Sequence, residues 1–298
     1  MVISRVTQSM LSDRSMSRLQ SSLTRMGEIQ EHLSTGRVLN RASDNPGDAA
    51  TAMRLRAAVN AQQQYARNAE DGQGWLDSLD STLGTAGDVV RRARELGSQG
   101  VNGAMSQQSR ESLAVEVDQI RTGLLASANT SYVGRPVFGG TTAGSKAFTE
   151  TAGVVTFAGD TNPVNRTVAD GVTIDVSSSG PAAFGPDGDN VFDHLTALSA
   201  ALRSGDTAGI QAGISALSGD GDRLVVARAG VGARTNAIEA AATKAGDTEL
   251  SLTNSLSEIE NADLPKTLMD LKMQETAYQA ALAATARVLQ PSLVDFLR

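Results

Sequence analysis

Few side chains in this sequence have the type and spacing that catalysis or metal binding requires. The chain has 298 residues and no cysteine, which excludes disulfides, thiol catalysis and cysteine-ligated metals. Its two histidines, His32 and His194, are far apart in the sequence, and neither has a second histidine at helical spacing. We therefore expect both histidines to be helix-surface residues, and we expect no metal site.

Two short patterns look like ligand-binding motifs but lack an essential residue. The glycine-rich run at 139–146 places Ser145 before Lys146, whereas a phosphate-binding loop has lysine before serine or threonine. The acidic run at 187–193 lacks the glutamate that completes an EF-hand calcium loop, so we expect a solvated acidic loop there. The sequence thus predicts no catalytic residue, no cofactor and no metal, and we do not expect an enzyme.

Net charge and hydropathy narrow the range of partners. The net charge is −7 and the chain has no long run of lysine or arginine, which argues against binding to nucleic acid. No apolar stretch approaches the roughly 20 residues that span a bilayer, and the N-terminal residues do not form a secretory signal. We expect no membrane association, and either a cytoplasmic location or export without a cleaved signal.

The positions of the prolines divide the chain into segments of different structure. An interior proline costs a helix about 3 kcal/mol, so long helices must lie between prolines. Proline-free tracts cover residues 47–135 and 187–264, whereas several prolines lie within 136–186. The sequence therefore predicts two helical tracts separated by an irregular or β-rich segment.

The second tract carries an unbroken heptad repeat of apolar residues, which predicts a helix of about 50 residues packed lengthwise on other long helices. The intervening fourth positions are mixed, and a break near Gly219–Gly221 is compatible with the sequence. The repeat consists of Ile210, Leu217, Leu224, Val231, Ile238, Ala245, Leu252 and Ile259.

The first tract predicts an antiparallel helical hairpin. The run Asp44-Asn45-Pro46 predicts a helix start, because aspartate and asparagine can cap a helix and proline is tolerated in its first turn. Apolar residues then alternate in steps of three and four from Leu76 to Ala93. A glycine-rich stop at 97–103 and a shorter apolar stripe from Leu113 to Leu124 complete the hairpin.

Two apolar stripes near the chain ends, here called the terminal stripes, form the candidate assembly interface. An isolated helix of this length is marginal in water, so each stripe needs the other or a neighbouring molecule. The interface residues are Met16, Leu19, Leu23, Met26 and Leu33 in the first stripe, and Leu268, Leu271, Leu282, Leu289, Leu293 and Phe296 in the second.

The middle segment has the composition of strands. Residues 154–157 and 172–176 are rich in β-branched side chains, and Asp170-Gly171 is typical of a type I′ hairpin turn. The predicted fold class is mainly α, a long antiparallel helical bundle or coiled coil with a small β-rich inserted domain.

These patterns give three expected domains. A terminal coiled-coil domain would comprise 1–40 and 265–298. A helical bundle domain would comprise 41–136 and 188–264, and the β-rich insertion would cover 137–187.

Several segments resemble one protein family. Residues 33–50, LSTGRVLNRASDNPGDAA, resemble the N-terminal signature of bacterial flagellins and of the junction proteins in the same family. Residues 68–72 and 90–100 are similar to motifs of the family's long helices, and 259–263 and 292–298 are similar to its C-terminal region. These matches cover both helical tracts and leave the middle of the chain unmatched.

One turn refines the resemblance within the family. Residues 132–141 resemble the Tyr-x-Gly-Arg-Tyr-x-Phe-Gly-Gly-Thr turn of hook–filament junction proteins. Flagellins usually carry a Gln-Phe-Asn-Gly-like stretch there, which this sequence lacks. Pro136 stands where the turn of the junction proteins has an aromatic residue.

The resemblance implies a structural adaptor at the hook–filament junction of a bacterial flagellum, with a flagellin-like fold whose chain ends pair as a coiled coil. It implies export through the flagellar type III system without a cleaved signal, and an extracellular location. The implied partners are hook-associated protein 1, flagellin, other copies of the chain in a ring, and a cytoplasmic export chaperone.

Two other interpretations stay open. A flagellin-like filament subunit would polymerise alone. A helical signalling domain, which is less favoured, would carry a membrane span or a fused output domain.

Overall fold

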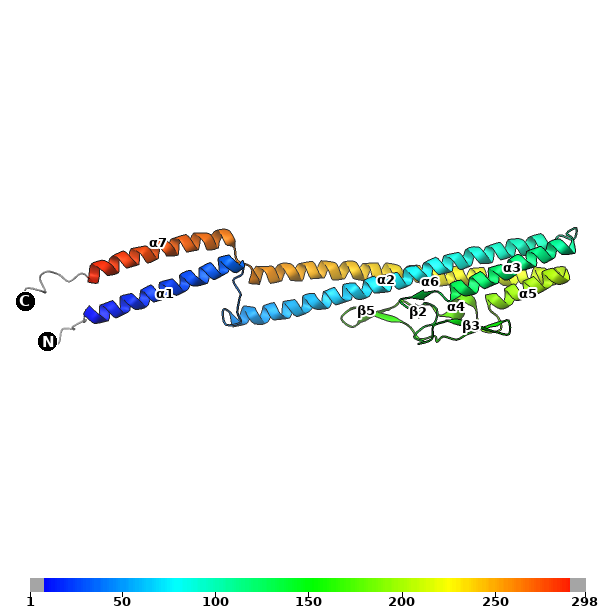
Figure 1. Ribbon diagram of the computed structural model, residues 1–298, viewed down its shortest axis with the longest axis horizontal. Coiled ribbons are helices and arrows are strands. Elements are labelled where there is room, and N and C mark those ends of the chain that lie inside the picture. Colours follow the sequence, from blue (N-terminus) through cyan, green and yellow to red (C-terminus); the bar gives the residue numbers. More distant parts are fainter. Residues whose placement is uncertain (1–7, 290–298) are drawn as a thin grey trace, which may run out of the picture. The chain divides into compact units, whose positions relative to one another are not determined.

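The computed structural model describes residues 8–289, whose helices and strands are labelled in Figure 1, and these residues form two compact units. Among the described residues, unit 1 comprises 8–60 and 250–289, and unit 2 comprises 61–249. The helices are α1 (Gln8–Thr35), α2 (Pro46–Gly100), α3 (Gln107–Ala128), α4 (Gly180–Phe184), α5 (Val191–Ser204), α6 (Thr207–Glu260) and α7 (Leu264–Leu289). The strands are β1 (Ser131–Tyr132), β2 (Arg135–Pro136), β3 (Phe148–Thr151), β4 (Val154–Phe157), β5 (Asn165–Ala169) and β6 (Val172–Asp175).

The hairpin of the first tract forms as the sequence predicts. The Asn45 side-chain oxygen accepts hydrogen bonds from the backbone N–H groups of Gly47 and Asp48, which caps α2 at its start. Helix α2 ends at Gly100, and Ser106 caps the returning helix α3.

Helix α6 carries the predicted heptad repeat. The repeat residues from Ile210 to Ala245 are buried, whereas Leu252 and Ile259 are partly buried. The sequence was compatible with a break in the helix at Gly219–Gly221, but α6 is continuous there. Buried Leu217 and Leu224 on either side anchor this stretch to the core, which outweighs the low helix propensity of glycine.

Three two-stranded antiparallel sheets lie between α3 and α5 in the sequence. The predicted hairpin is confirmed: β5 pairs with β6, and Gly171 in the connecting turn has a φ of +67°. Strand β3 pairs with β4, and the Phe148 ring lies 5.5 Å from the rings of Phe157, Phe184 and Phe192. Phe192 belongs to α5, so this aromatic cluster joins the strands to the helices of unit 2.

Unit 2 has a continuous hydrophobic core, to which α2, α3, α5, α6 and the inserted strands all contribute. The observed mixture of long antiparallel helices with a small β-rich insertion confirms the predicted fold class. The largest fully buried side chains are Trp75, Leu76, Leu79, Leu83, Leu96, Leu124, Phe138, Phe148, Phe184, Phe192, Leu195 and Leu198.

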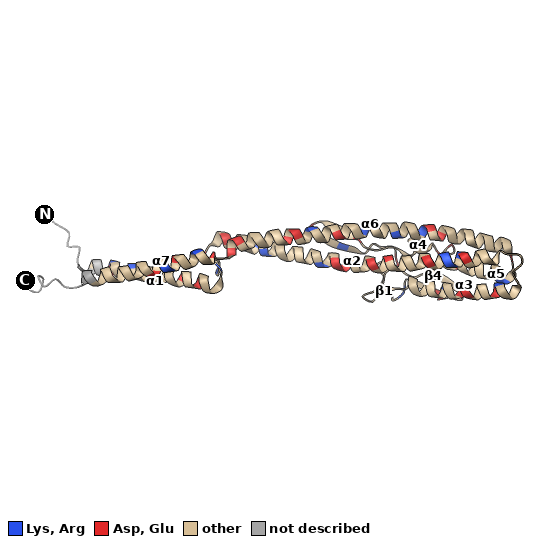
Figure 2. Cartoon of the chain, turned by 90° about the horizontal axis from the view of Figure 1, so that it is seen from above, with Lys and Arg blue, Asp and Glu red and all other residues tan. Residues whose placement is uncertain are grey.

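The surfaces of the described helices carry charges of both signs. Figure 2 shows acidic and basic residues interspersed along α2, α3 and α6. None of the helices described is long and apolar enough to cross a membrane.

Candidate assembly surface

Helices α1 and α7 of unit 1 pack side by side (Figure 1). Gln274 of α7 donates a hydrogen bond to the Ser22 hydroxyl oxygen at 2.8 Å and a second to the Ser22 carbonyl oxygen at 3.3 Å. Leu19 is buried near this contact in the chain. The two helices that carry the terminal stripes therefore pack against each other.

The terminal stripes are only partly covered by this pairing. Among the predicted interface residues, Leu19 is buried, and three others are partly buried: Met26, Leu33 and Leu271. Four others are exposed: Met16, Leu23, Leu268 and Leu282. The side chains of Leu289, Leu293 and Phe296 lie outside the described part of the chain.

Further apolar side chains of unit 1 are exposed that the sequence analysis did not single out. Met269 and Met273 are each 66% exposed and lie four residues apart, on one line along α7. Sequence reasoning followed the neighbouring line through Leu268 and missed this one, although its four-residue spacing was visible. The other exposed apolar side chains of unit 1 that lie outside the predicted stripes are Met10, Val38, Met53, Leu250 and Leu264.

Unit 1 buries very little apolar surface of its own. Among its described residues the buried apolar side chains are Leu19, Ala49 and Ala52, whereas all other buried apolar residues belong to unit 2. Large exposed apolar patches mark sites of interaction with other proteins. We call the exposed apolar side chains of α1 and α7 the assembly surface: Met10, Met16, Leu23, Leu264, Leu268, Met269, Met273 and Leu282.

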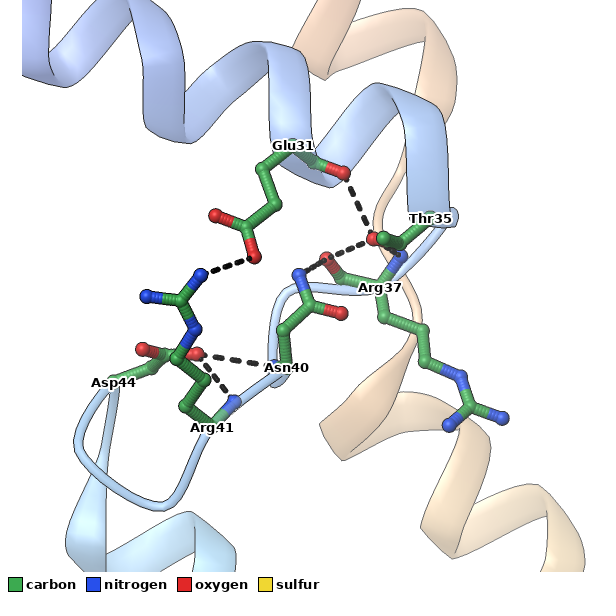
Figure 3. A network of polar contacts seen from close by, with 6 residues as sticks. All are labelled: Glu31, Thr35, Arg37, Asn40, Arg41 and Asp44. Carbon is green, nitrogen blue, oxygen red and sulfur yellow. Dashed lines mark hydrogen bonds and ion pairs between the residues drawn. The ribbon is translucent and has the colours of Figure 1, made fainter.

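A polar turn connects α1 to α2 (Figure 3). Gly36 adopts a φ of +69° and donates its N–H to the His32 carbonyl, an arrangement that ends α1 and that favours glycine. The Thr35 hydroxyl donates to the Glu31 carbonyl at 2.8 Å and accepts from the Arg37 N–H at 3.2 Å. The chain direction thus changes immediately after α1.

The Asp44 carboxylate closes the second half of this turn. Its Oδ2 atom accepts hydrogen bonds from the backbone N–H groups of Asn40 at 3.0 Å and Arg41 at 2.7 Å (Figure 3). The Arg41 guanidinium returns to Glu31 of α1 at 3.3 Å. The segment that resembled the family signature is therefore a folded, hydrogen-bonded turn.

The same turn is tied to the end of α6. Val38 donates its N–H to the Glu260 carbonyl, and Ala262 donates to the Gly36 carbonyl, which forms a short antiparallel bridge. The Glu260 side chain is 5% exposed and lies 2.7 Å from Arg56 and 3.8 Å from Arg37. A buried carboxylate at the end of α6 thus pairs with Arg37 of the turn and with Arg56 of α2.

A pocket of about 340 Å³ lies beside this turn. Acidic and amide side chains line it together with three apolar ones, and its lining residues include no serine, threonine, cysteine or lysine that could act as a nucleophile. The described residues contain no cluster of three or more side chains placed to hold a metal. The lining residues are Glu28, Glu31, His32, Val38, Leu39, Asn40, Asp44, Asn45, Asp48 and Ile259.

His194 is not the helix-surface residue that we expected from the sequence. The His194 side chain is 19% exposed and lies between two aspartates, so it is not an ordinary surface residue. The sequence could not predict this, because Asp220 comes from a different helix.

Two models of known protein families match the chain. The model described as the bacterial flagellin N-terminal helical region matches residues 6–143. The model described as the bacterial flagellin C-terminal helical region matches residues 222–297. Together they cover more than half of the chain, including all of α1, α2, α3 and α7.

Two curated relatives match over very different lengths. The chain is 24% identical to the flagellar hook-associated protein 3 of Escherichia coli (strain K12), over 94% of this chain and 95% of that protein. It is 34% identical to the flagellar filament 33 kDa core protein of Treponema phagedenis over 90 residues, which are 30% of this chain. That alignment spans only 32% of the core protein.

A solved structure has a similar fold. The crystal structure of Bacillus cereus FlgL superimposes with a TM-score of 0.60 and 25% sequence identity. The superposition covers 68% of this chain and 99% of that chain.

Proposed function

This chain belongs to the bacterial flagellin family, and we propose that it is a structural adaptor at the junction between the hook and the filament of a bacterial flagellum. Its family is one of structural flagellar proteins rather than of enzymes. The proposed mechanism is packing alone: the chain presents apolar surface that neighbouring subunits cover.

The observation that carries the proposal is the assembly surface. Unit 1 exposes methionine and leucine side chains along α1 and α7 while burying almost no apolar surface internally. Burial of apolar area contributes about 25 cal/mol per Å², so covering this surface strongly favours association. Methionine side chains are flexible enough to pack against unlike neighbours, as an adaptor between two polymers requires.

The lengths of the two alignments favour a junction protein over a filament subunit. The match to hook-associated protein 3 runs from end to end, whereas the match to the filament core protein is confined to about a third of that protein. A helical signalling domain gains no support from either family model.

The proposed partners follow from the junction role. Hook-associated protein 1 would lie below, flagellin above, and further copies of the chain beside it in a ring. Before assembly the chain would bind a cytoplasmic export chaperone and leave the cell through the flagellar type III system. The assembly surface is the part of the chain that we assign to these contacts.

Substitution of the assembly surface tests this function. We propose Met269→Gln together with Met273→Gln, because glutamine keeps helix propensity and side-chain length but removes apolar surface. The matched control is Val225→Gln with Val226→Gln, two exposed positions on α6 in unit 2. Both variants should retain the helical circular-dichroism signal, since none of the four side chains is buried.

Electron microscopy of cells carrying these variants gives the result. The methionine variant should build hooks, lose most filaments and release flagellin into the medium, whereas the valine variant should keep its filaments. Normal filaments with the methionine variant would contradict the role of the assembly surface. Long filaments formed by the purified wild-type chain alone would replace the junction role by that of a filament subunit.

A further inference from the structure

A histidine in unit 2 bridges two carboxylates. His194, in the first turn of α5, places Nδ1 2.7 Å from Asp220 Oδ2 and Nε2 2.9 Å from Asp189 Oδ1. Arg223 donates to the other oxygen of Asp220 at 3.0 Å. The chain contains one other histidine, His32 in unit 1, so His194 is the only imidazole of unit 2.

This cluster joins three parts of the chain. Asp189 belongs to the segment 185–190, which connects α4 to α5, His194 belongs to α5, and Asp220 and Arg223 belong to α6. Gly185 in the same segment has a φ of +96°, and a Cβ there would lie 2.5 Å from the backbone carbonyl oxygen of Asp189. Asn190 caps α5 and also donates to the Val155 carbonyl of β4 at 3.3 Å.

The two carboxylates differ in their access to water. The Asp220 side chain is 2% exposed and depends on His194 and Arg223 for its hydrogen bonds, whereas the Asp189 side chain is 68% exposed. Asp189 can therefore exchange its histidine partner for water, and Asp220 cannot.

Imidazole chemistry makes this bridge dependent on protonation. A protonated imidazole donates two hydrogen bonds, one from each nitrogen, but a neutral imidazole has a single N–H. Loss of the proton leaves a nitrogen lone pair facing a carboxylate oxygen, which is repulsive. One of the two contacts must then break, and the contact to exposed Asp189 costs least to lose.

We propose that His194 is a proton-operated latch: when protonated it fastens the segment 185–190 to α5 and α6, and when neutral it releases that segment while keeping Asp220. The latch thereby controls how firmly the connection between α4 and α5 is held to the helices of unit 2. It is independent of the proposed junction function, since it lies within unit 2.

The surrounding charges set the direction of the pH dependence. Partial burial lowers the pKa of His194, but hydrogen bonds and charge from Asp220 and then Asp189 raise it, and the net pKa lies above the usual 6.5. Burial raises the pKa of Asp220, against the opposing effect of His194 and Arg223. Helix α3 also packs on α5, but its Glu111 pairs with Arg203 at the far end of α5.

The direction in which stability changes with pH follows from the raised pKa of His194. A group that binds its proton more tightly in the closed state stabilises that state fully below pH 6.5 and loses this contribution as the pH rises through the folded pKa. Histidine is the side chain that ordinarily titrates in this range, and unit 2 has no other. Opening of the segment 185–190 should therefore increase above neutral pH.

Amide hydrogen exchange on the full-length chain between pH 6 and 9 tests the latch, after correction for the intrinsic pH dependence of exchange. In the wild type, protection of amides at 185–194 should fall about tenfold per pH unit between pH 6.5 and the folded pKa. A titration of the His194 imidazole by nuclear magnetic resonance, identified by its absence in His194→Gln, should have a midpoint above 6.5.

Two variants make the test decisive. His194→Gln should give protection at 185–194 that does not change with pH. Asp189→Asn changes an exposed side chain that tolerates substitution, and it should weaken the protection at low pH and lower the midpoint of the His194 titration. An unchanged pH profile in either variant, or pH-independent protection in the wild type, would overturn the latch.

Discussion

Val133 occupies a backbone conformation that β-branched residues rarely adopt. It forms the two-residue turn between β1 and β2 with Gly134, at φ values of +48° and +77°. Type I′ turns of this kind favour asparagine at the first position, because its short polar side chain tolerates a positive φ. Val133 is also 81% exposed, so it gains almost no burial in return.

Val133→Asn should therefore stabilise the chain by about 1 kcal/mol. The measurement is the midpoint of urea-induced unfolding, which should rise. Val154→Asn is the matched control, since Val154 is exposed in β4 and has an ordinary backbone conformation. A lower midpoint for Val133→Asn would mean that the valine makes a contact worth more than the strain.

For Glu260 of unit 1 we predict the opposite effect, a loss of stability on substitution. Its carboxylate is nearly inaccessible and lies 2.7 Å from Arg56, while the arginine side chain is about half exposed. Glu260→Gln should lower the unfolding free energy by about 1 to 3 kcal/mol, because it removes the charge with which a buried carboxylate pairs with Arg56 and Arg37. Glu258→Gln, at an exposed position two residues earlier, should change it by less than about 0.5 kcal/mol.

At the scale of the elements, periodicity predicted the long helices but not the shortest elements. The heptad from Ile210 and the cap at Asn45 each depend on local spacing, and both are present. Strands β1 and β2 have two residues each and α4 has five, which is too short for any period to appear. The continuity of α6 past Gly219 depends on tertiary packing, which a local pattern does not contain.

Two glycines of α2 should respond oppositely to alanine. A Cβ added at Gly87 would have no neighbour within 4 Å, whereas one added at Gly97 would lie 2.9 Å from Ile214 Cγ1. Gly87→Ala should raise the unfolding free energy by about 0.5 to 1 kcal/mol through helix propensity. Gly97→Ala should lower it by about 1 to 3 kcal/mol, because Ile214 must move.

Thermal melting of both variants measures this difference. Equal shifts would show that the approach of α6 to α2 at this level is looser than the structure indicates. The comparison is internal, since both glycines lie in one helix and the substituted side chain is the same.

At the scale of the whole molecule, the sequence predicted that the candidate assembly surface lies on the two terminal helices, but not which of their apolar side chains are exposed. The terminal stripes were visible as apolar spacing, yet which members remain exposed depends on how α1 meets α7. The line through Met269 and Met273 needed that packing to be recognised as surface. The polar turn with Glu260 joins residues more than two hundred positions apart, and no local pattern reports such a contact.

Oxidation of methionine in assembled flagella tests the account most directly. Exposed methionine reacts with peroxide to form a sulfoxide, and burial slows the reaction. In the purified chain, Met16, Met269 and Met273 should oxidise readily, because all three are exposed. In isolated flagella that retain hook and filament, mass spectrometry should find these three methionines strongly protected, with Met105 of unit 2 as the internal comparison. Equal oxidation of the three methionines in the free and the assembled chain would contradict the claim that this surface is buried in the flagellum.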